Sequence, residues 1–449
     1  MSEKNNQKVV TRFAPSPTGV LHIGNTRTAF FNYLFAKKYD GKFILRVEDT
    51  DTERSKKEYE ENIKESMNWL GLDYDEFYRQ SDRSEIYKEY LQKLIDSGNA
   101  YISKESTGDR TEVIRFKNPN KKITFDDMIR GPITFDTQEL GDFVIAKSLT
   151  EPLYHLAVVV DDHQMGITHI IRGEDGISNT PRQILIQDGI GAIKPKYAHL
   201  PLILGQDKSK LSKRHGAVSI TEYRNLGYIK EAILNHLAML SWNPGTDQEI
   251  FTMNELIKEF SVEKINKSAA VFNIEKLDWF NKEHLKKVDQ TELNNLILEK
   301  LKRISGFDYN NAEKIQKLLP IIKERLSKIS DIDKMISDGE LEYFFNLPKY
   351  EIEKIIWKKS DKKDTIEYLS EILSRLQNSS EDNFSSTENI KNIIWDYAEQ
   401  KGRGQVLWPL RFSLSGREKS PDPFTLVFVL GKTDTINRIK IAISNLNEE

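Results

Sequence analysis

The stretch Arg12-Phe13-Ala14-Pro15-Ser16-Pro17-Thr18-Gly19, which leads through Val20 and Leu21 into His22-Ile23-Gly24-Asn25, decides the fold. An apolar run at residues 9–13 predicts a buried strand before it, and apolar side chains at helical spacing follow over residues 25–39. The stretch is therefore expected to turn from a strand into a helix. At such a turn the N–H groups and the positive end of the helix dipole face phosphates, and the two glycines let the backbone approach a ligand closely.

A second motif, Lys210-Leu211-Ser212-Lys213-Arg214, lies far downstream. Its lysines can bring mobile positive charge onto a leaving pyrophosphate, and His22 can donate a hydrogen bond to a phosphoryl oxygen whose charge grows in the transition state. Each motif alone is weak, because a lone His-Ile-Gly is often structural and a lysine-rich loop is usually a solvated surface. Together and in this order they indicate an ATP site in two halves, with His22, Lys210 and Lys213 as catalytic residues.

The composition limits the class of protein. A chain of 449 residues is expected to form several domains, and 38% apolar with 30% charged residues is typical of a soluble globular protein. No apolar run is long enough to span a membrane and no secretory signal opens the sequence, so we expect a cytoplasmic location. The absence of cysteine excludes disulfides, thiol catalysis and thiolate zinc sites. The net charge of -3 argues against a uniformly basic surface, although 66 lysines and arginines still permit a basic face.

The first third of the chain alternates between strand and helix patterns. Residues 43–47 predict a strand, and residues 53–70 and 84–97 predict helices that are each ended by a glycine. We therefore predict an α/β fold with a Rossmann-type doubly wound nucleotide-binding domain. Shorter strands, such as residues 113–116 and 143–146, indicate an α+β insertion in that domain.

The parallel-strand pattern returns at residues 156–160, 169–172 and 200–204. Beyond residue 219 the periodicity is almost only helical, beginning with residues 220–242, so we predict an all-α C-terminal region. On sequence alone these helices could equally be a generic scaffold or an oligomerisation module. The polar run at residues 378–387 predicts an exposed loop.

The motifs resemble those of the class I aminoacyl-tRNA synthetases, and within them the bacterial glutamyl-tRNA synthetases. The resemblance covers most of the chain, and residues 285–390 match only in helical character. The further matching segments are Arg46-Val47-Glu48-Asp49-Thr50-Asp51, Tyr154-His155-Leu156, Val159-Val160-Asp161-Asp162-His163, Arg172-Gly173-Glu174-Asp175, Asn179-Thr180-Pro181-Arg182-Gln183 and Gly404-Gln405-Val406-Leu407-Trp408-Pro409-Leu410-Arg411. Glutaminyl enzymes resemble each other in carrying β-barrels where this chain has helices, so the helical region favours glutamate.

The resemblance implies a division of the chain into domains. Residues 1–80 and 156–218 would form the two halves of the Rossmann catalytic domain, and residues 81–155 an insertion that binds the acceptor stem of tRNA. Residues 219–290 would form a helical stem-contact domain, and residues 291–449 a helical anticodon-binding domain. The expected partner is tRNA(Glu), with tRNA(Gln) as a further candidate. A monomer is expected, since nothing resembles a coiled-coil seam.

An amino acid with two carboxylates needs two cationic clamps, and guanidinium groups bind carboxylates in bidentate fashion. Arg12 and Arg172 both stand at predicted strand ends, where side chains converge. The alternative for Arg172 is an ordinary ion pair with Glu174 or Asp175. The resemblance implies a glutamate site in which Glu48 binds the α-ammonium, the other members hold the carboxylates or line the pocket, and the full set is Arg12, Ala14, Ser16, Glu48, Tyr154 and Arg172.

The implied reaction has two steps. The α-carboxylate of glutamate attacks the α-phosphorus of ATP to form an adenylate, and the terminal ribose of tRNA then takes the glutamyl group. Magnesium is expected with ATP, held mainly by the phosphates and by water. The implied ATP-binding residues are Pro15, Ser16, Thr18, Gly19, His22, Gly24, Glu174, Lys210, Ser212, Lys213 and Arg214.

Several positions depart from the family pattern. The linker between Tyr101 and Val113 is short and lacks the cysteines that bind zinc in some relatives, so zinc is not expected. Asn25 replaces the last histidine of its motif, Val158 stands where some relatives have a polar contact to the amino acid, and Gly176 stands where histidine is more common.

Other readings of the same residues stay open on sequence alone. Asp161-Asp162-His163 could be a metal cluster, or could cap a strand and orient the Arg172 loop. A nucleotidylyltransferase, a glutaminyl enzyme or a truncated tRNA-modifying relative would leave the helical region unexplained or of the wrong type. A catalytically dead paralogue predicts damage at His22, Lys210 or Lys213, and all three are intact.

Overall fold

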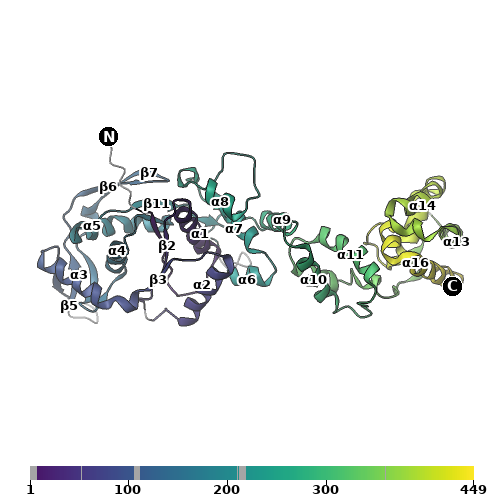
Figure 1. The fold of residues 1–449 in the computed structure, drawn as a ribbon, viewed down its shortest axis with the longest axis horizontal. Helices are drawn as coiled ribbons and strands as arrows, with labels where there is room; N and C mark the ends of the chain where they lie inside the picture. Colours follow the sequence, from purple (N-terminus) through teal and green to yellow (C-terminus); the bar gives the residue numbers. More distant parts are fainter. Residues whose placement is uncertain are drawn as a thin grey trace. The chain divides into compact units, whose positions relative to one another are not determined.

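The computed structural model describes residues 8–51, 53–105, 112–209, 211, 219–358 and 360–448. The chain divides into two compact units, Met1–Leu285 and Lys286–Glu449. In Figure 1 the first unit runs from purple to green and contains all the strands drawn, and the second runs from green to yellow and is helical. The two units are described separately below.

Parallel strands form the centre of the first unit. β1 (Val10–Phe13), β2 (Lys42–Val47) and β3 (Glu76–Arg79) pair in that order, and β10 (His169–Gly173) pairs with β11 (Lys196–Leu200). The two sets meet where the Thr168 N–H donates to the Val10 carbonyl at 3.0 Å. Because the chain proceeds outward in opposite directions from β1 and β10, the carboxyl ends of these two strands border a topological switch point, where α/β proteins bind ligands.

Helices cover this parallel sheet. The helices of the first unit are α1 (Ile23–Lys38), α2 (Lys57–Leu70), α3 (Ser84–Asp96), α4 (Tyr154–Gln164), α5 (Thr180–Ile190), α6 (Ile220–Asn225), α7 (Lys230–Ser241), α8 (Met253–Glu259) and α9 (Ile274–Leu285). α1 is apolar on most of its surface, and Phe30, Phe31 and Leu34 are fully buried. α2 ends at Gly71, whose φ of 73° is a left-handed conformation that favours glycine. The α/β prediction is confirmed.

The segment between α3 and α4 contributes strands to two sheets. The antiparallel strands β4 (Ala100–Lys104), β5 (Glu112–Phe116), β8 (Phe143–Ser148) and β9 (Glu151–Pro152) form one sheet, as the α+β insertion predicts. The hairpin of β6 (Lys122–Asp127) and β7 (Gly131–Asp136) instead extends the parallel sheet, because Asp127 pairs with Tyr197 of β11. This hairpin therefore forms the edge of the sheet beyond β11.

The prediction of a strand at residues 156–160 is wrong. These residues lie inside α4, and all five are at most 2% exposed. A helix buried on all sides carries no amphipathic period, so a short apolar run does not distinguish it from a buried strand. The predicted strand at residues 200–204 is also divided, because β11 ends before Pro201 and a short strand, β12 (Ile203–Leu204), follows in another sheet.

Four further predictions about helices and loops differ from the structure. The helix expected from residue 53 begins at Lys57, and the helix expected over residues 220–242 is two helices separated at Gly227, whose φ is 80°. The helical region contains one short strand, β13 (Ala270–Val271), which pairs with β12. The run at residues 378–387 is not simply exposed, since its one-turn helix η8 (Glu381–Ser385) buries Phe384.

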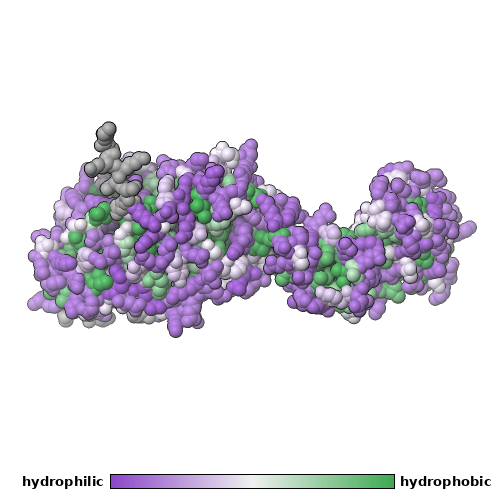
Figure 2. Space-filling model, in the orientation of Figure 1, coloured by the Kyte–Doolittle hydropathy of each residue, from purple (hydrophilic) through white to green (hydrophobic). Residues whose placement is uncertain are grey.

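The second unit is helical throughout its described residues, which confirms the prediction of an all-α C-terminal region. Its helices are α10 (Gln290–Leu301), α11 (Ala312–Arg325), α12 (Ser330–Ser337), α13 (Lys362–Asn378), α14 (Thr387–Lys401), α15 (Arg403–Ser415) and α16 (Pro423–Glu448). Fully buried aliphatic residues from four of them, such as Leu369, Ile394, Leu410 and Leu426, form its interior. Figure 2 shows a mostly hydrophilic face on each unit. Within the described residues, every helix is too short or too polar to cross a membrane.

Candidate active site

Two adjoining pockets open at the carboxyl ends of β1 and β10. The larger has a volume of about 820 Å³ and is lined by residues from the turn before α1, from α1 itself and from the segments after β10 and β11. The smaller has a volume of about 290 Å³ and lies over the ends of β1, β2 and β10. Thr18, Asn25 and Thr28 line both pockets, so a ligand in one lies next to a ligand in the other.

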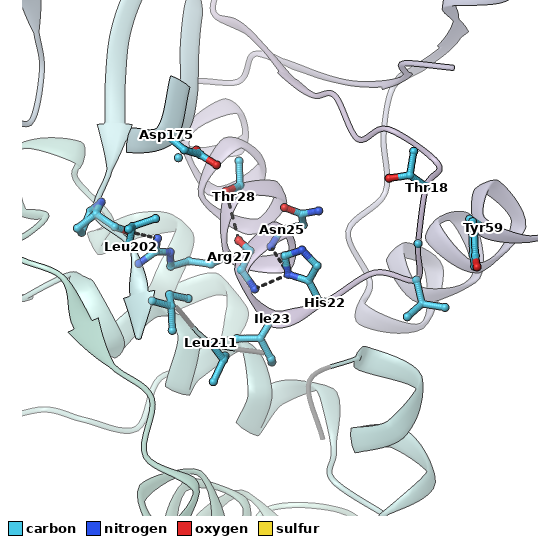
Figure 3. A pocket seen from close by; sticks show the side chains of 16 residues that line it. Thr18, His22, Ile23, Asn25, Arg27, Thr28, Tyr59, Asp175, Leu202 and Leu211 are labelled. Atoms are coloured by element: carbon cyan, nitrogen blue, oxygen red, sulfur yellow. Dashed lines mark hydrogen bonds between the residues drawn. The ribbon is translucent and has the colours of Figure 1, made fainter. Parts of the chain in front are cut away.

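The larger pocket contains the N-terminus of α1 (Figure 3). His22 is the N-cap residue, and its Nδ1 accepts hydrogen bonds from the N–H groups of Gly24, at 3.1 Å, and Asn25, at 3.3 Å. Two of the N–H groups that were expected to face phosphates therefore bind the His22 ring here. A neutral imidazole that accepts at Nδ1 carries its proton on Nε2, the form that can donate to a phosphoryl oxygen.

Gly24 gives the His22 ring room in this position. A Cβ on Gly24 would lie 3.2 Å from Cε1 and 3.3 Å from Nδ1 of His22. By contrast, a Cβ on Gly19, which also lines the larger pocket, would meet nothing within 4 Å, as expected where backbone faces open pocket space.

Arg27 and Glu174 join the pocket wall to its neighbours. Arg27 is 3% exposed, donates to the Pro201 carbonyl, and points toward Leu202 in Figure 3. Burial lowers the pKa of Arg27 to about 10, against the opposing effect of Glu174. Glu174, a predicted ATP contact, accepts a hydrogen bond from the Leu202 N–H at 2.7 Å and forms an ion pair with Arg130. Through its hydrogen bond with Leu202, Glu174 thus holds the segment after β11 in place.

The motif that contains the predicted lysines lies mostly outside the described residues. Lys210, Ser212, Lys213 and Arg214 are not among the described residues, whereas Leu211 is. The Leu211 N–H donates to the Ile203 carbonyl at 3.2 Å, and its side chain lines the larger pocket (Figure 3). The described part of this motif therefore borders the pocket that contains the His-Ile-Gly element.

The smaller pocket brings together the predicted glutamate-binding residues. All six, Arg12, Ala14, Ser16, Glu48, Tyr154 and Arg172, line it. Val158, Phe13 and Ile171 add apolar surface. The position that carries a polar group in some relatives is therefore an apolar wall here, provided by the 2% exposed Val158.

A network of buried charges lies beneath this pocket. Arg46 is fully buried and binds Asp162 at 2.7 Å and Glu48 at 3.0 Å, while Arg12 binds Asp162 at 3.1 Å. Asp161 accepts from Arg83 at 2.7 Å and from the Tyr87 hydroxyl at 2.8 Å. The network pairs the arginines Arg12, Arg46 and Arg83 with the carboxylates Glu48, Asp161 and Asp162.

Burial raises the pKa of Glu48 above its ordinary value, although Arg46 opposes the shift. Burial also acts to raise the pKa of Asp162, but the charges of Arg12 and Arg46 outweigh it and lower that pKa. No role was predicted for Arg46 from the sequence. A signal was present, since an arginine inside a buried apolar strand requires carboxylate partners.

The structure also gives the surroundings of Asp161-Asp162-His163. The triplet lies on α4 rather than at a strand end, and Asp162 binds Arg12 and Arg46 rather than the Arg172 loop. Within the described residues, no group of three or more histidines and carboxylates is arranged to hold a metal ion. Asp161 and Asp162 therefore position the arginines of the buried charge network.

Arg172 differs from the arginines of the buried charge network, because none of its described contacts is a carboxylate. Its Nε donates to Nε2 of His199 at 3.1 Å, and its Nη2 donates to Thr180 Oγ1 at 2.9 Å and to the Gly176 carbonyl at 3.1 Å. Nη1 is buried and has no hydrogen-bond partner among the described residues. Burial lowers the pKa of Arg172, and the charge of Arg12 adds to that effect. The alternative of an ion pair with Glu174 or Asp175 is wrong, since the described contacts of Arg172 include neither carboxylate and Glu174 binds Arg130 instead. The pocket therefore contains a buried cation suited to an anionic ligand.

Comparisons with known proteins agree with this geometry. Residues 8–112 and 102–279 match the family model described as tRNA synthetases class I (E and Q), catalytic domain, and residues 265–443 match the anticodon binding domain. The glutamate–tRNA ligase of Aquifex aeolicus is 41% identical over 98% of this chain and 100% of its own length. The glutamate–tRNA ligase 1 of Petrotoga mobilis is 41% identical over 97% of each chain.

Solved structures show the same relationship. The crystal structure of a glutamate tRNA ligase from Elizabethkingia meningosepticum in complex with its amino acid has a TM-score of 0.84 and 35% sequence identity, and the match covers 98% of this chain and 100% of that one. The structure of the glutamate-tRNA synthetase from Elizabethkingia anophelis matches equally well. The resemblance predicted from the motifs is confirmed, and the chain belongs to the glutamate–tRNA ligases, a family of class I tRNA synthetases.

Proposed function

We propose that this chain activates L-glutamate with ATP to form glutamyl-adenylate and transfers the glutamyl group to the 3′ end of tRNA(Glu), releasing AMP and diphosphate. The observation that carries the proposal is the contact between the two pockets through Thr18, Asn25 and Thr28. Adenylate formation requires an amino-acid carboxylate beside the α-phosphate of ATP. Adjacent sites for a small zwitterion and a nucleotide meet that requirement and supply catalysis by positioning.

The smaller pocket is the proposed glutamate site. Glu48 would bind the α-ammonium, and Arg12, Tyr154 and Arg172 the carboxylates. The buried guanidinium of Arg172, which has no carboxylate partner among the described residues, supports this assignment. A glutamine amide would leave this cation without a counter-charge, which costs on the order of 1–3 kcal/mol and favours glutamate without editing. Ala14 and Ser16 would line the same pocket.

The larger pocket is the proposed ATP site. His22 would donate to a phosphoryl oxygen, and Lys210 and Lys213 would stabilise charge on the departing diphosphate. Asp175 is the one carboxylate among the described residues that line this pocket. A magnesium ion that accompanies ATP, and neutralises charge on its phosphates, would therefore be held mainly by the phosphates and water. The remaining proposed contacts are Pro15, Ser16, Thr18, Gly19, Gly24, Glu174, Ser212 and Arg214.

The tRNA is proposed to contact both units. Residues 81–155 and 219–290 would bind the acceptor stem, and residues 291–449 the anticodon. A match of residues 265–443 to an anticodon binding domain supports the last assignment. We further propose that the protein is a cytoplasmic monomer and that tRNA(Gln) is a second candidate acceptor.

The experiment that tests this function is ATP/pyrophosphate exchange with glutamate and with glutamine, each with and without bulk tRNA. Exchange with glutamate that depends on tRNA is the expected result, because this subgroup resembles enzymes that activate their amino acid only with tRNA bound. Exchange without tRNA would indicate the chemistry of a truncated relative. Exchange with glutamine alone, or none under any condition, would contradict the proposal.

A further inference from the structure

Asp127 and His199 form a buried pair behind Arg172, outside both pockets. Both side chains are fully buried, and they come from β6 and β11, the strands that join the insertion hairpin to the parallel sheet. Oδ2 of Asp127 accepts from the His199 N–H at 3.0 Å and from Nδ1 of the same residue at 2.7 Å. Oδ1 accepts from the N–H groups of Ile129, at 3.0 Å, and Arg130, at 2.9 Å.

These contacts determine the tautomer of His199. Four hydrogen bonds from N–H donors keep Asp127 ionised, and they lower its pKa although burial acts in the opposite direction. An ionised carboxylate only accepts hydrogen bonds, so Nδ1 of His199 must carry a proton. Burial lowers the pKa of His199, although Asp127 opposes this, and the ring is neutral at pH 7. Its Nε2 is therefore an acceptor, and it faces Nε of Arg172 at 3.1 Å.

We propose that Asp127 and His199 are positioning residues that hold the Arg172 guanidinium by its Nε and Nη2 edge and leave Nη1 for the carboxylate of glutamate. Thr180 and the Gly176 carbonyl accept from Nη2, and the one guanidinium nitrogen without a described partner is Nη1. The inference rests on the proposed function. It adds that the preference for a carboxylate depends on a hydrogen-bond relay whose first member lies in the insertion hairpin.

Gly176 allows the arginine to lie in this position. A Cβ on Gly176 would lie 2.6 Å from Nε and 2.9 Å from Cδ of Arg172, both closer than van der Waals contact. The side chain thus crosses directly over the glycine while its Nε reaches His199. The glycine that departs from the family pattern therefore leaves the space that the Arg172 side chain occupies.

Two substitutions at His199 separate its two hydrogen bonds. In His199→Asn the amide can still donate to Asp127, but no acceptor reaches Arg172. In His199→Gln an amide oxygen can reach the place of Nε2 and accept from Arg172. We expect His199→Asn to raise the KM for glutamate roughly ten- to a hundredfold, the loss typical of a hydrogen bond to a charged group, and to lower the glutamate-to-glutamine ratio of kcat/KM.

The KM for ATP is expected to stay within about twofold in both variants, because His199 does not line the larger pocket. His199→Gln should recover most of the glutamate affinity. The matched control is His169→Asn on β10, whose ring packs on Phe35 outside both pockets and which should leave the kinetics unchanged. An unchanged KM for glutamate in His199→Asn, or an equal loss in the asparagine and glutamine variants, would overturn the relay.

A second measurement does not depend on whether the variants fold. The ¹⁵N chemical shifts of the imidazole nitrogens in the wild-type protein report the tautomer of His199, with the ring resonances assigned by through-bond correlation to the backbone of the same protein. A protonated Nδ1 with an unprotonated Nε2 is expected, and a proton on Nε2 would overturn the relay. A wild-type enzyme that fails to activate glutamate would contradict the proposed function instead, and the tautomer would still test the relay.

Discussion

Arg46, which is fully buried, and Arg172, which is partly buried, are two arginines of one site with opposite electrostatic surroundings. Arg46 has carboxylate partners at 2.7 and 3.0 Å, whereas the described contacts of Arg172 are uncharged groups. Removing one partner of a buried ion pair strongly destabilises a protein, because the other charge is then left uncompensated. A buried cation without a carboxylate partner instead costs stability until an anion binds. The two residues should therefore respond differently to removal.

Arg46→Ala is expected to destabilise the protein by about 3–5 kcal/mol, because Glu48, Asp161 and Asp162 would lose a shared cation. Arg172→Ala is expected to change the free energy of unfolding by roughly 1 kcal/mol or less, since the lost contacts are offset by removal of an unpaired charge. Chemical denaturation of the two variants and the wild type measures this difference.

Arg172→Ala, which should hardly change the stability, should have a large effect on the kinetics. Arg172→Ala should raise the KM for glutamate and reduce discrimination against glutamine by at least tenfold, while the protein stays folded. A stable Arg172→Ala variant with unchanged preference would mean that the second carboxylate clamp is another residue. Equal destabilisation by both substitutions would contradict the account of the buried charges.

At the scale of elements, α2 is fastened to the end of β3 by a single carboxylate. Glu60 accepts two hydrogen bonds from Arg79, at 2.7 and 3.0 Å, and one from Lys64 at 2.6 Å, with its side chain 10% exposed. The Arg79 hydrogen bonds are the main reason that the pKa of Glu60 is lowered to about 2. Because the pKa is depressed in the folded state, Glu60 stabilises the protein above its ordinary pKa of 4.5, and this contribution is lost as the pH falls toward 2.

Glu60→Gln is therefore expected to lower the stability by about 1–2 kcal/mol at pH 7, after allowance for solvent screening, and by less at pH 3.5. Denaturation midpoints at the two pH values measure the change. Glu58→Gln on the same helix is the control, because Glu58 is 65% exposed in its pair with Lys56 and should show little effect at either pH. A Glu60→Gln deficit that does not narrow at pH 3.5 would show that packing, rather than charge, is responsible.

The same scale shows which elements the sequence could predict. α2 and α3 have one apolar face each, and their predicted and observed ranges agree except at the start of α2. α4 was predicted as a strand because it is buried on all sides. That Arg12 and Arg172 line one pocket could be predicted from their places at strand ends. Asp127 and His199 could not, since their contact depends on the long-range pairing of β6 with β11.

At the scale of the whole molecule, each unit has its own apolar interior. The interior of the second unit is formed by buried residues of its own helices, among them Ile322, Leu369, Ile394 and Ile439. The first unit contains both pockets and the charge network. The change from mixed to helical periodicity near residue 219 predicted a helical C-terminal region, but the two units divide at Leu285 and Lys286, so α6 to α9 belong to the first unit.

Separate cores imply that the units can be tested apart. A fragment of residues 286–449 is expected to be helical by circular dichroism and to unfold cooperatively, because the buried aliphatic residues it needs are all its own.

A fragment of residues 1–285 should retain both pockets, yet charge tRNA(Glu) and a variant with an altered anticodon at equal rates, whereas the full chain should favour the unaltered tRNA. Aminoacylation of the two tRNAs by both proteins measures this. If the short fragment still distinguished the anticodons, or the full chain did not, the second unit could not be the anticodon reader. If the fragment of residues 286–449 unfolded without cooperativity, its fold would instead depend on the first unit.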